Sequence, residues 1–393
     1  MDNFVFYSPT LFVFGKDEAK RTAELVKRFG GNRVLLVYGG GAVKRNGAYD
    51  VVADSLREAD IFCCELSGVQ PNPLSGKVYE GISLVRENDV DFILAVGGGS
   101  VIDTAKAIGF GALYDGDFWD FFTRKVPLER TLPVGVVLTI SAAGSEGSDS
   151  AVITLEQGMH KWGSPRTDVI RPKFAIMDPV FTTTLPAWQT ACGAVDIFSH
   201  VAERYFTNTE DVALTDRLCE ALMKTVVDAA PKALAEPMAY APRADLMWAG
   251  MMAHNNSCGV GREHDWASHQ IEHELSAFSD CAHGAGLAVV MPAWMEYVME
   301  HDVDRFVRFA VQVFGCEADA ANPENTARAG IAALRAFFRS LGMPEKLSQL
   351  SETLEADIPA MVAHRKEKPG GFPFGNFVKI DETGMEQILR ACV

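Results

Sequence analysis

Histidines gather in one stretch of this chain, with the spacing expected of metal ligands. Six of the nine lie in the stretch that begins at His200 and ends at His283. Asp196 and His200 are four residues apart, and His269 and His273 repeat that spacing, which places each pair on one face of a helix. One carboxylate with two or three imidazoles suits a divalent first-row metal, Fe(II) or Zn(II). Spacing leaves open which of these five residues bind the ion.

A rival interpretation uses part of the same segment. Residues 269–273, His-Gln-Ile-Glu-His, fit H-x-x-E-H, the pattern of inverted zinc metallopeptidases. In that case His269 and His273 bind zinc and Glu272 activates water. The Asp196–His200 pair would then have no role, so a metallopeptidase is a remote alternative.

A glycine-rich turn predicts a phosphate site. In DFILAVGGGSVIDTAKAI, an apolar run leads into Gly97, Gly98 and Gly99, followed by a helical pattern. Glycines can adopt positive φ and let backbone amides approach an anion, and the start of a helix favours negative charge. Ser100 is a natural N-cap, and Asp103 would complete a capping box. The turn fits neither of the two best-known phosphate-binding motifs, so alone it is a weak signal.

Two further loops strengthen this prediction. Gly39–Gly41 follows another apolar run, and TISAAGSEGSDS (139–150) follows a third. The turn at Gly39–Gly41 lacks the acidic residue that NAD-selective sites place there, and Lys44 and Arg45 come just after it. We therefore predict NADP(H) rather than NAD(H), although both cations would equally suit a solvated helix face.

The order of elements predicts an α/β domain followed by a helical one. Near-continuous apolar runs at 33–38, 91–96 and 133–140 are typical of strands in a parallel sheet buried on both faces. Helical periodicity at 48–60 suggests βαβ units, and the run 151–155 reads as another strand. The first fifteen residues suggest a strand pair.

Beyond Pro186 the pattern is helical almost to the end, at 211–234, 242–257, 301–315 and 325–342. We therefore expect a Rossmann-like dinucleotide-binding domain over 1–185 and an all-α metal-binding and substrate domain over 186–393. The stretch 364–371 is expected to be an exposed loop.

Composition narrows the classes of partner. The formal charge of −16 disfavours general binding to nucleic acid or an anionic membrane. No apolar run reaches the roughly 18–20 residues that cross a bilayer. Eight scattered cysteines without a C-x-x-C pair suggest neither a disulfide framework nor a cysteine zinc site, so a cytoplasmic setting is expected.

Taken together, several ordered motifs resemble the iron-containing alcohol dehydrogenase family, above all its NADPH-dependent butanol dehydrogenase-like branch. They are PTLFVFG (9–15), YGGG (38–41), PNP (71–73), VGGGSVIDTAKAI (96–108), AAGSE (142–146), DIFSH (196–200), HQIEHELSA (269–277) and HGAGLA (283–288). Each is weak alone, but the combination spans nearly the whole chain and is specific.

The resemblance implies a metal-dependent alcohol dehydrogenase or aldehyde reductase that transfers hydride between NADP(H), or NAD(H), and a small alcohol or aldehyde. It implies that the ligands of one Fe(II) or Zn(II) are Asp196, His200, His269 and His283. His273 would lie beside the ion as a proton-relay group. The implied cofactor contacts are Gly39, Gly40, Gly41, Asn72, Gly97, Gly98, Gly99, Ser100, Asp103, Thr139 and Lys161. Family members are commonly homodimers.

The chain departs from the family pattern at two positions, and other functions remain open. Gly147 stands where a methionine is expected, and His264 where a small residue is expected. Cys281, close to His283, suggests oxidative sensitivity or a buried apolar role. A polyol dehydrogenase or a dehydroquinate synthase-like lyase would use the same fold. A nucleotide-sensing or metal-storage protein is a non-catalytic alternative.

Overall fold

The computed structural model describes residues 1–142 and 144–393, and the chain divides into two compact units. The α/β unit contains Tyr7–Pro186 and Glu236–Asn255. The helical unit contains Met1–Phe6, Ala187–Ala235 and Asn256–Val393. Among the described residues, no helix combines the length and the apolar composition that crossing a bilayer requires.

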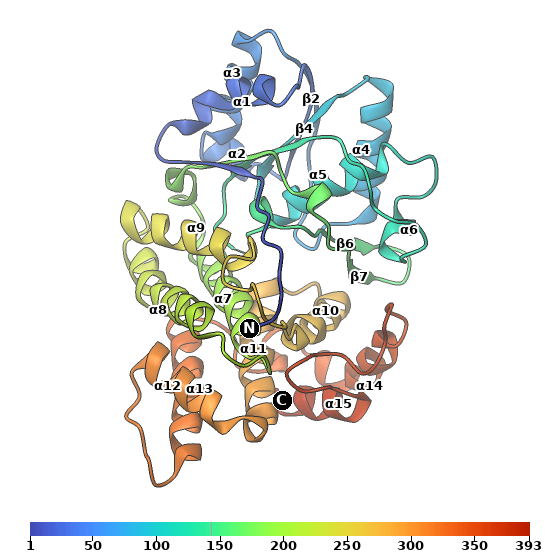
Figure 1. Ribbon diagram of the computed structural model, residues 1–393. Coiled ribbons are helices and arrows are strands. Elements are labelled where there is room, and N and C mark those ends of the chain that lie inside the picture. Colours follow the sequence, from blue (N-terminus) through green and yellow to red (C-terminus); the bar gives the residue numbers. More distant parts are fainter. Residues whose placement is uncertain (143) are drawn as a thin grey trace. The chain divides into compact units, whose positions relative to one another are not determined.

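A parallel sheet forms the centre of the α/β unit (Figure 1). Its six strands run in the order β1-β8-β5-β4-β2-β3. Their bounds are β1 Leu11–Phe14, β2 Arg33–Tyr38, β3 Phe62–Leu66, β4 Phe92–Gly97, β5 Val134–Leu138 and β8 Phe174–Met177. Every pairing in this sheet is parallel, which confirms the predicted α/β class.

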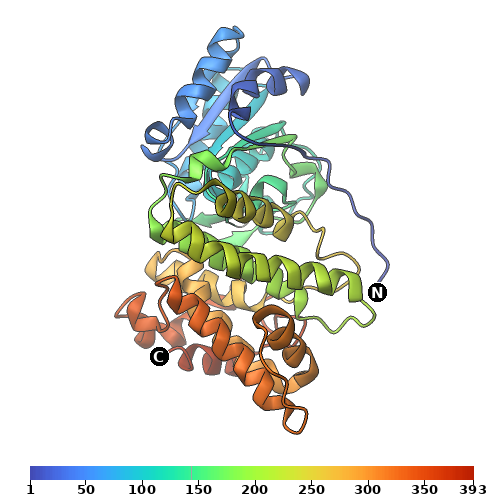
Figure 2. The same cartoon turned by 90° about the vertical axis from the view of Figure 1, so that its left-hand side faces the viewer.

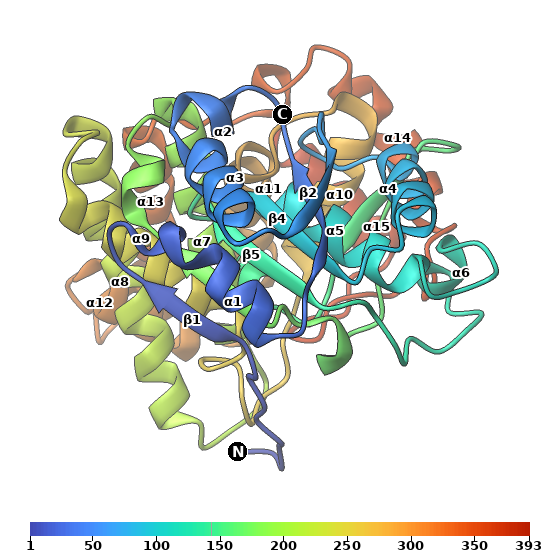
Figure 3. The same cartoon turned by 90° about the horizontal axis from the view of Figure 1, so that it is seen from above.

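Helices cover both faces of this sheet, which explains why its central strands are apolar throughout. Helices α1 and α3 pack on one face, and α4 and α5 on the other (Figure 3). The helices of this unit are α1 Thr22–Arg28, α2 Ala42–Arg45, α3 Ala48–Glu58, α4 Ser75–Glu87, α5 Gly99–Gly111, α6 Trp119–Phe122 and α9 Tyr240–His254. Alternate residues of β2 serve opposite cores: Leu35 faces α4 and α5, and Leu36 faces α1 and α3.

The helical unit is built from eight helices in the described chain. They are α7 Ala187–Tyr205, α8 Ala213–Ala235, α10 Ala267–Ser279, α11 His283–Val298, α12 Val303–Phe314, α13 Pro323–Ser340, α14 Leu354–Arg365 and α15 Glu382–Arg390. Helix α8 is the long yellow-green helix of Figure 2, and it packs against α7. Helix α11 packs against both α7 and α10, so the three helices that carry the predicted metal ligands are held together by α11.

Four local predictions were wrong. The N-terminal segment forms one strand rather than two, because β1 pairs with β8 and residues 1–10 form no strand. The run 151–155 does not join the main sheet. It forms β6 (Val152–Leu155), which pairs antiparallel with β7 (His160–Gly163) in a separate sheet.

The third error concerns residues 364–371. Helix α14 continues to Arg365, whose side chain is buried against the rings of Phe372 and Phe374, and the exposed turn begins only after it. The fourth is the capping box at Ser100. Helix α5 starts at Gly99 with Gly98 as its N-cap and no side-chain cap, so Ser100 already lies within the first turn.

Candidate metal centre and dinucleotide site

Four side chains from three helices of the helical unit converge on one point. Helix α7 carries Asp196 and His200, α10 carries His269, and α11 begins at His283. Oδ1 of Asp196 lies 3.3 Å from Nε2 of His200 and 3.7 Å from Nε2 of both His269 and His283. The two Nε2 atoms of His200 and His269 are 3.2 Å apart. The ligand-type atoms of Asp196, His200 and His269 lie within 4.8 Å of one another, a spacing that one ion could bridge, and Nε2 of His283 approaches the same Asp196 oxygen.

Local backbone geometry brings α11 close enough for this. A Cβ on Gly284 would collide with the carbonyl of Cys192, one turn before Asp196 on α7. Only glycine therefore lets the start of α11 pack against α7 and carry His283 to Asp196. At the start of α10, Oδ2 of Asp265 accepts a hydrogen bond from the Ala267 amide at 3.0 Å.

Two glutamates orient the histidines from behind. Nδ1 of His269 donates to Oε2 of Glu203, and Nδ1 of His283 donates to Oε2 of Glu272. Both glutamates are completely buried. A proton on Nδ1 leaves the Nε2 lone pair of each ring turned toward Asp196, which is the arrangement common behind metal-binding histidines.

The electrostatics of the cluster favour a cation. Burial would raise the pKa of Asp196, but the His200 and His283 imidazoles outweigh it and hold that pKa well below its usual value. Burial, with His269 next to it, lowers the pKa of His200 to about 3. Burial alone would lower the pKa of His269. The negative charges of Glu203 and Asp196 outweigh burial and raise this pKa to about 9. A divalent ion would replace that proton.

The donor set fits a divalent ion. Oδ1 of Asp196 is buried and has no hydrogen-bond partner among the described residues, although three imidazoles surround it. A buried carboxylate oxygen without a donor is costly unless it binds a cation. A ligand set of one carboxylate and three neutral imidazole nitrogens suits iron or zinc.

Glu272 does not have the environment that a metallopeptidase requires. Its Oε2 accepts from His283, and its Oε1 accepts from the hydroxyl of Ser276. The side chain is completely buried, so both oxygens are engaged within the protein and neither faces water. The H-x-x-E-H pattern at 269–273 is therefore explained by packing around His283.

His273 is placed beside this cluster. Its ring centroid lies 6.0 Å from that of His283, and its Nδ1 lies 3.3 Å from Nζ of Lys368. His264 instead packs against the ring of Trp266, and its Nε2 lies 2.7 Å from the carbonyl oxygen of Gly259. Cys281 is buried beside Ser276.

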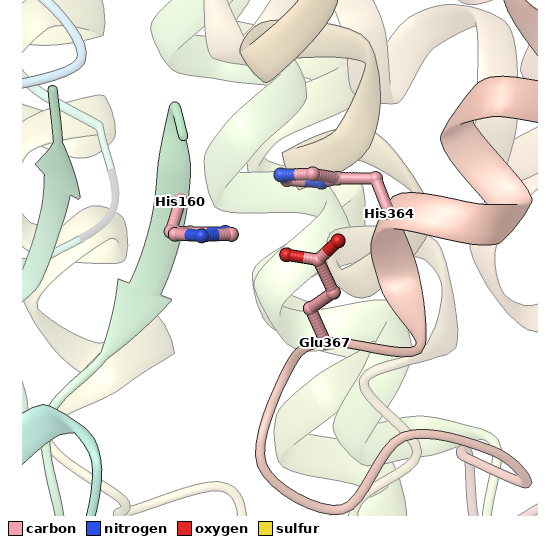
Figure 4. A group of neighbouring side chains, drawn as sticks. All are labelled: His160, His364 and Glu367. Atoms are coloured by element: carbon pink, nitrogen blue, oxygen red, sulfur yellow. The ribbon is translucent and has the colours of Figure 1, made fainter. Parts of the chain in front are cut away.

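Figure 4 draws a second group of side chains with ligand chemistry. His364 extends from α14 and Glu367 from the turn that follows it. Nδ1 of His364 lies 2.6 Å from Oε2 of Glu274 on α10, so this imidazole already has a carboxylate partner in the helical unit. His160, also drawn, belongs to β7 of the α/β unit.

The predicted glycine turns lie at the carboxyl ends of adjacent strands in the α/β unit. Gly39–Gly41 follows β2, Gly97–Gly99 spans the end of β4 and the start of α5, and Thr139 follows β5. The Thr139 amide donates to the carbonyl of Gly97 at 3.0 Å, which ties the second and third loops together. Open α/β sheets bind ligands at this edge.

Packing, and not positive φ, accounts for the glycines of the turn after β4. None of Gly97, Gly98 and Gly99 has positive φ. A Cβ on Gly97 would lie 2.6 Å from Cγ2 of Val101, and one on Gly98 would lie 3.1 Å from Cδ1 of Ile140. The missing side chains let α5 and the β5 loop close over the strand end. Gly40 and Gly99 face open space.

The remaining predicted cofactor residues lie elsewhere in the α/β unit. Asn72 lies in the turn before α4 with φ 52°, and Lys161 is a buried residue of β7 paired with Thr154. Asp103 does not cap α5. Its Oδ1 accepts from the Ser145 hydroxyl at 2.5 Å and its Oδ2 from the Val152 amide at 2.8 Å. Ala143, part of the AAGSE motif, lies outside the described residues.

Sequence reasoning missed the residues that support these sites. Glu203 lies three residues after His200, and Glu272 lies three residues after His269. Each glutamate thus lies one turn after one histidine but bonds to a second histidine on a different helix. The spacing of the histidines was therefore visible in the sequence, whereas the role of the glutamates was not. Lys106, a completely buried residue of α5, was not singled out either.

Comparison with known proteins places the chain in a family. Residues 9–179 match "Iron-containing alcohol dehydrogenase", and residues 190–393 match "Fe-containing alcohol dehydrogenase family, C-terminal". The chain is 45% identical to the "Probable NADH-dependent butanol dehydrogenase 2" of Bacillus subtilis over 100% of both chains. It is 37% identical to the "NADPH-dependent aldehyde reductase YqhD" of Escherichia coli, over 99% of this chain and 95% of that protein.

A solved structure agrees with this assignment. The crystal structure of NADH-dependent butanol dehydrogenase A from Thermotoga maritima superimposes with a TM-score of 0.96 at 40% identity, covering 100% of this chain and 99% of that one. The chain belongs to the iron-containing alcohol dehydrogenase family of oxidoreductases.

Proposed function

We propose that this protein transfers hydride between NADP(H) and a primary alcohol or aldehyde of the butanol type, with one Fe(II) or Zn(II) held by Asp196, His200, His269 and His283. The observation that carries the proposal is the convergence of these four side chains, with Oδ1 of Asp196 within 3.7 Å of three imidazole nitrogens. The named activities of the Bacillus and Escherichia relatives support the reaction class.

When bound, the ion would polarise the substrate oxygen as a Lewis acid. The protein's part is to hold its ligands in the correct form. Glu203 and Glu272 keep the proton of His269 and His283 on Nδ1, and the buried Asp196 supplies the negative charge. The nicotinamide supplies the hydride chemistry, and the protein supplies its placement.

His273 is proposed as the proton-relay group. It lies beside His283, and its Nδ1 lies 3.3 Å from Nζ of Lys368, so a titratable ring that could exchange a proton with the substrate oxygen stands next to a proposed ligand. If His273→Ala leaves the pH–rate profile unchanged, this role is wrong.

The preference for NADP(H) rests on the turn after β2. No acid occupies Gly39–Gly41, and Nη1 of Arg45 would lie 3.0 Å from a Cβ at Gly41, so its guanidinium lies over that glycine. Nζ of Lys44 lies 4.6 Å from the ring centre of Tyr49. Two cations would attract a 2′-phosphate. Some relatives are named for NADH and others for NADPH, so their names do not decide the cofactor of this chain. The proposed preference therefore rests on the chain's own residues.

We also propose a homodimer in a reducing, cytoplasmic setting. Met1, Phe4, Val5, Phe6 and Tyr7 expose large apolar side chains, and β1 is an edge strand of the sheet, both of which favour association with a second copy. None of the eight cysteines forms a disulfide in the described chain.

The test is turnover with butanal and NADPH or NADH, before and after chelation and with iron or zinc added back. Turnover should be lost on chelation and restored by one of the two metals. His269→Ala and Asp196→Ala should abolish turnover yet keep the fold and NADPH binding, and full activity in either would refute the ligand assignment. Net NADPH consumption separates a reductase from a dehydroquinate synthase-like lyase, which regenerates its cofactor. A glycerol-type substrate added to the screen separates a polyol dehydrogenase.

A further inference from the structure

The α/β unit contains a lysine that is completely removed from solvent. Lys106 lies on α5 with no exposed surface. Its Nζ faces five oxygens, all from one short loop: the carbonyl and hydroxyl oxygens of Ser145 at 2.7 and 3.1 Å, those of Ser148 at 3.2 and 2.9 Å, and the carbonyl oxygen of Ser150 at 2.9 Å. These contacts form an oxygen cage around the amine.

An ammonium group in such a cage resembles a bound monovalent cation. It has three N–H donors, which the five oxygens must share. A buried charge is tolerated only where hydrogen bonds and opposite charges compensate for lost hydration. Burial lowers the pKa of Lys106 to about 8, while Asp103, Asp149 and Glu146 oppose that shift and Arg171 adds to it. The amine is therefore mainly protonated at pH 7.

The same loop is fixed by other buried groups. Arg171 donates to the carbonyl of Gly147 and pairs with Asp149 at 3.3 Å. Asp103, three residues before Lys106 on α5, accepts from the Ser145 hydroxyl. A Cβ on Gly144 would collide with the carbonyl of Gly250, so α9 closes the loop from another side.

The loop that forms the cage lies next to the glycine turn of the proposed dinucleotide site. The loop follows β5, whose carboxyl end is paired with that of β4, and the Gly97–Gly99 turn there leads into α5. One helix, α5, thus carries the proposed pyrophosphate turn at its start and, at Lys106, the cation that holds the neighbouring loop. Loop and turn are tied to the same helix.

We propose that Lys106 is a positioning residue that acts as a built-in monovalent cation and fixes residues 144–150 as a preformed wall of the dinucleotide site. This inference rests on the proposed function for the identity of the ligand, but the oxygen cage itself does not depend on it. A wall that is already ordered reduces the conformational entropy lost when the cofactor binds.

The experiment removes the amine and returns an ammonium from solution. Lys106→Ala leaves room for a small cation, whereas Lys106→Met removes the donors but keeps the volume filled. Each variant is measured with ethylammonium chloride, and with tetramethylammonium chloride, which has no N–H, at equal ionic strength. The readouts are hydrogen exchange of the amides in 144–152 and the Kd of NADPH and NADH from nicotinamide fluorescence. Lys125→Ala, an exposed lysine of the same unit, is the control.

Lys106→Ala should lose exchange protection in 144–152, but not in α8, and should raise the cofactor Kd about tenfold or more. Ethylammonium should restore both in Lys106→Ala and neither in Lys106→Met. Unchanged protection, or equal rescue by tetramethylammonium, would overturn the proposal.

If Lys106→Ala does not fold, Ser148→Ala removes one cage oxygen. It should partly lose the same protection and weaken cofactor binding, and an unchanged variant would count against the cage. The experiment distinguishes failure of this proposal from failure of the proposed function. If ethylammonium restores exchange protection of the loop but the parent protein shows no turnover, the role of Lys106 is supported and the proposed dehydrogenase activity is refuted.

Discussion

Glu203 accepts a hydrogen bond from Nδ1 of His269, and Nε2 of the same imidazole lies 3.7 Å from Oδ1 of Asp196. Glu272 repeats this relationship with His283. Each glutamate is buried and bonds to a histidine on another helix, so the tautomer of each ring and the packing of the helices are set together.

Glu203→Gln and Glu272→Gln should weaken metal binding by about 10–100-fold, because a carboxylate behind a ligating histidine orients the ring and increases its basicity. Metal affinity is measured by competition with a chelator in the purified protein. Glu274→Gln is the matched control, since this buried glutamate of α10 bonds to His364, away from the cluster. Equal metal affinity in all three variants would contradict the orienting role.

Arg45→Ala should lower kcat/KM with NADPH about tenfold and leave the value with NADH nearly unchanged, because the guanidinium lies over Gly41 and, in the proposed site, would pair only with a 2′-phosphate. Steady-state rates at two salt concentrations check this, since the NADPH effect should shrink as salt screens the charge. The control is Arg57→Ala on α3, whose guanidinium bonds to Asp54 at 2.7 Å. An equal loss with both cofactors would argue against phosphate recognition.

Gly147→Met should destabilise the protein by about 1–3 kcal/mol, because its Cβ would lie 3.1 Å from Cζ of Phe12 and 3.3 Å from Cβ of Asn255. The free energy of unfolding is measured in urea. Adding Phe12→Leu should recover part of the loss. Gly163→Ala serves as control, since its Cβ would meet only Val152, at 3.9 Å. A Gly147→Met protein as stable as the parent would show that this loop accepts the methionine of the family pattern.

Glu146→Gln should change how stability depends on pH. Burial raises the pKa of Glu146 from 4.5 to about 7, so the folded protein keeps this proton between those pH values while the unfolded chain has released it. The stability from the neutral carboxyl is complete below pH 4.5 and is lost as the pH rises to 7. Glutamine stays neutral throughout.

Relative to the parent, the Glu146→Gln variant should therefore gain about 3 kcal/mol in free energy of unfolding between pH 4.5 and pH 8. Urea unfolding across that range checks the value, and Glu58→Gln, an exposed acid at the end of α3, is the control. A difference between parent and variant that does not change with pH would mean that Glu146 has the same pKa in the folded protein as in the unfolded chain.

The elements that sequence could predict are those with strong local patterns. The apolar runs at β2, β4 and β5 and the helical periodicities of α3, α8, α12 and α13 all correspond to observed elements. Strand β3 was missed because it is a short edge strand: its apolar residues are followed at once by Glu65, and residues 62–65 are exposed or only partly buried. The capping role of Asp103 was wrong because its hydrogen-bond partners, Ser145 and Val152, are more than forty residues away.

The candidate metal cluster shows the same limit. Spacing put Asp196 with His200 and identified His269 and His283 as suitable residue types, and their ligation of a metal stays a prediction. That these side chains meet depends on the close approach of Gly284 to Cys192, and that they are oriented depends on buried glutamates from neighbouring helices. Neither relationship has a local signature, because both join residues far apart in the chain.

The placement of α9 in the α/β unit has a consequence for recombining this protein with its relatives. The polypeptide passes from one unit to the other four times, and α9 contributes Met247 and Met251 to the core beneath α5. A chimera joined at residue 186 would take this helix from one parent and the loop around Gly144 from the other. With crossovers at residues 186, 235 and 255, α9 and the sheet unit that it packs in would come from the same parent.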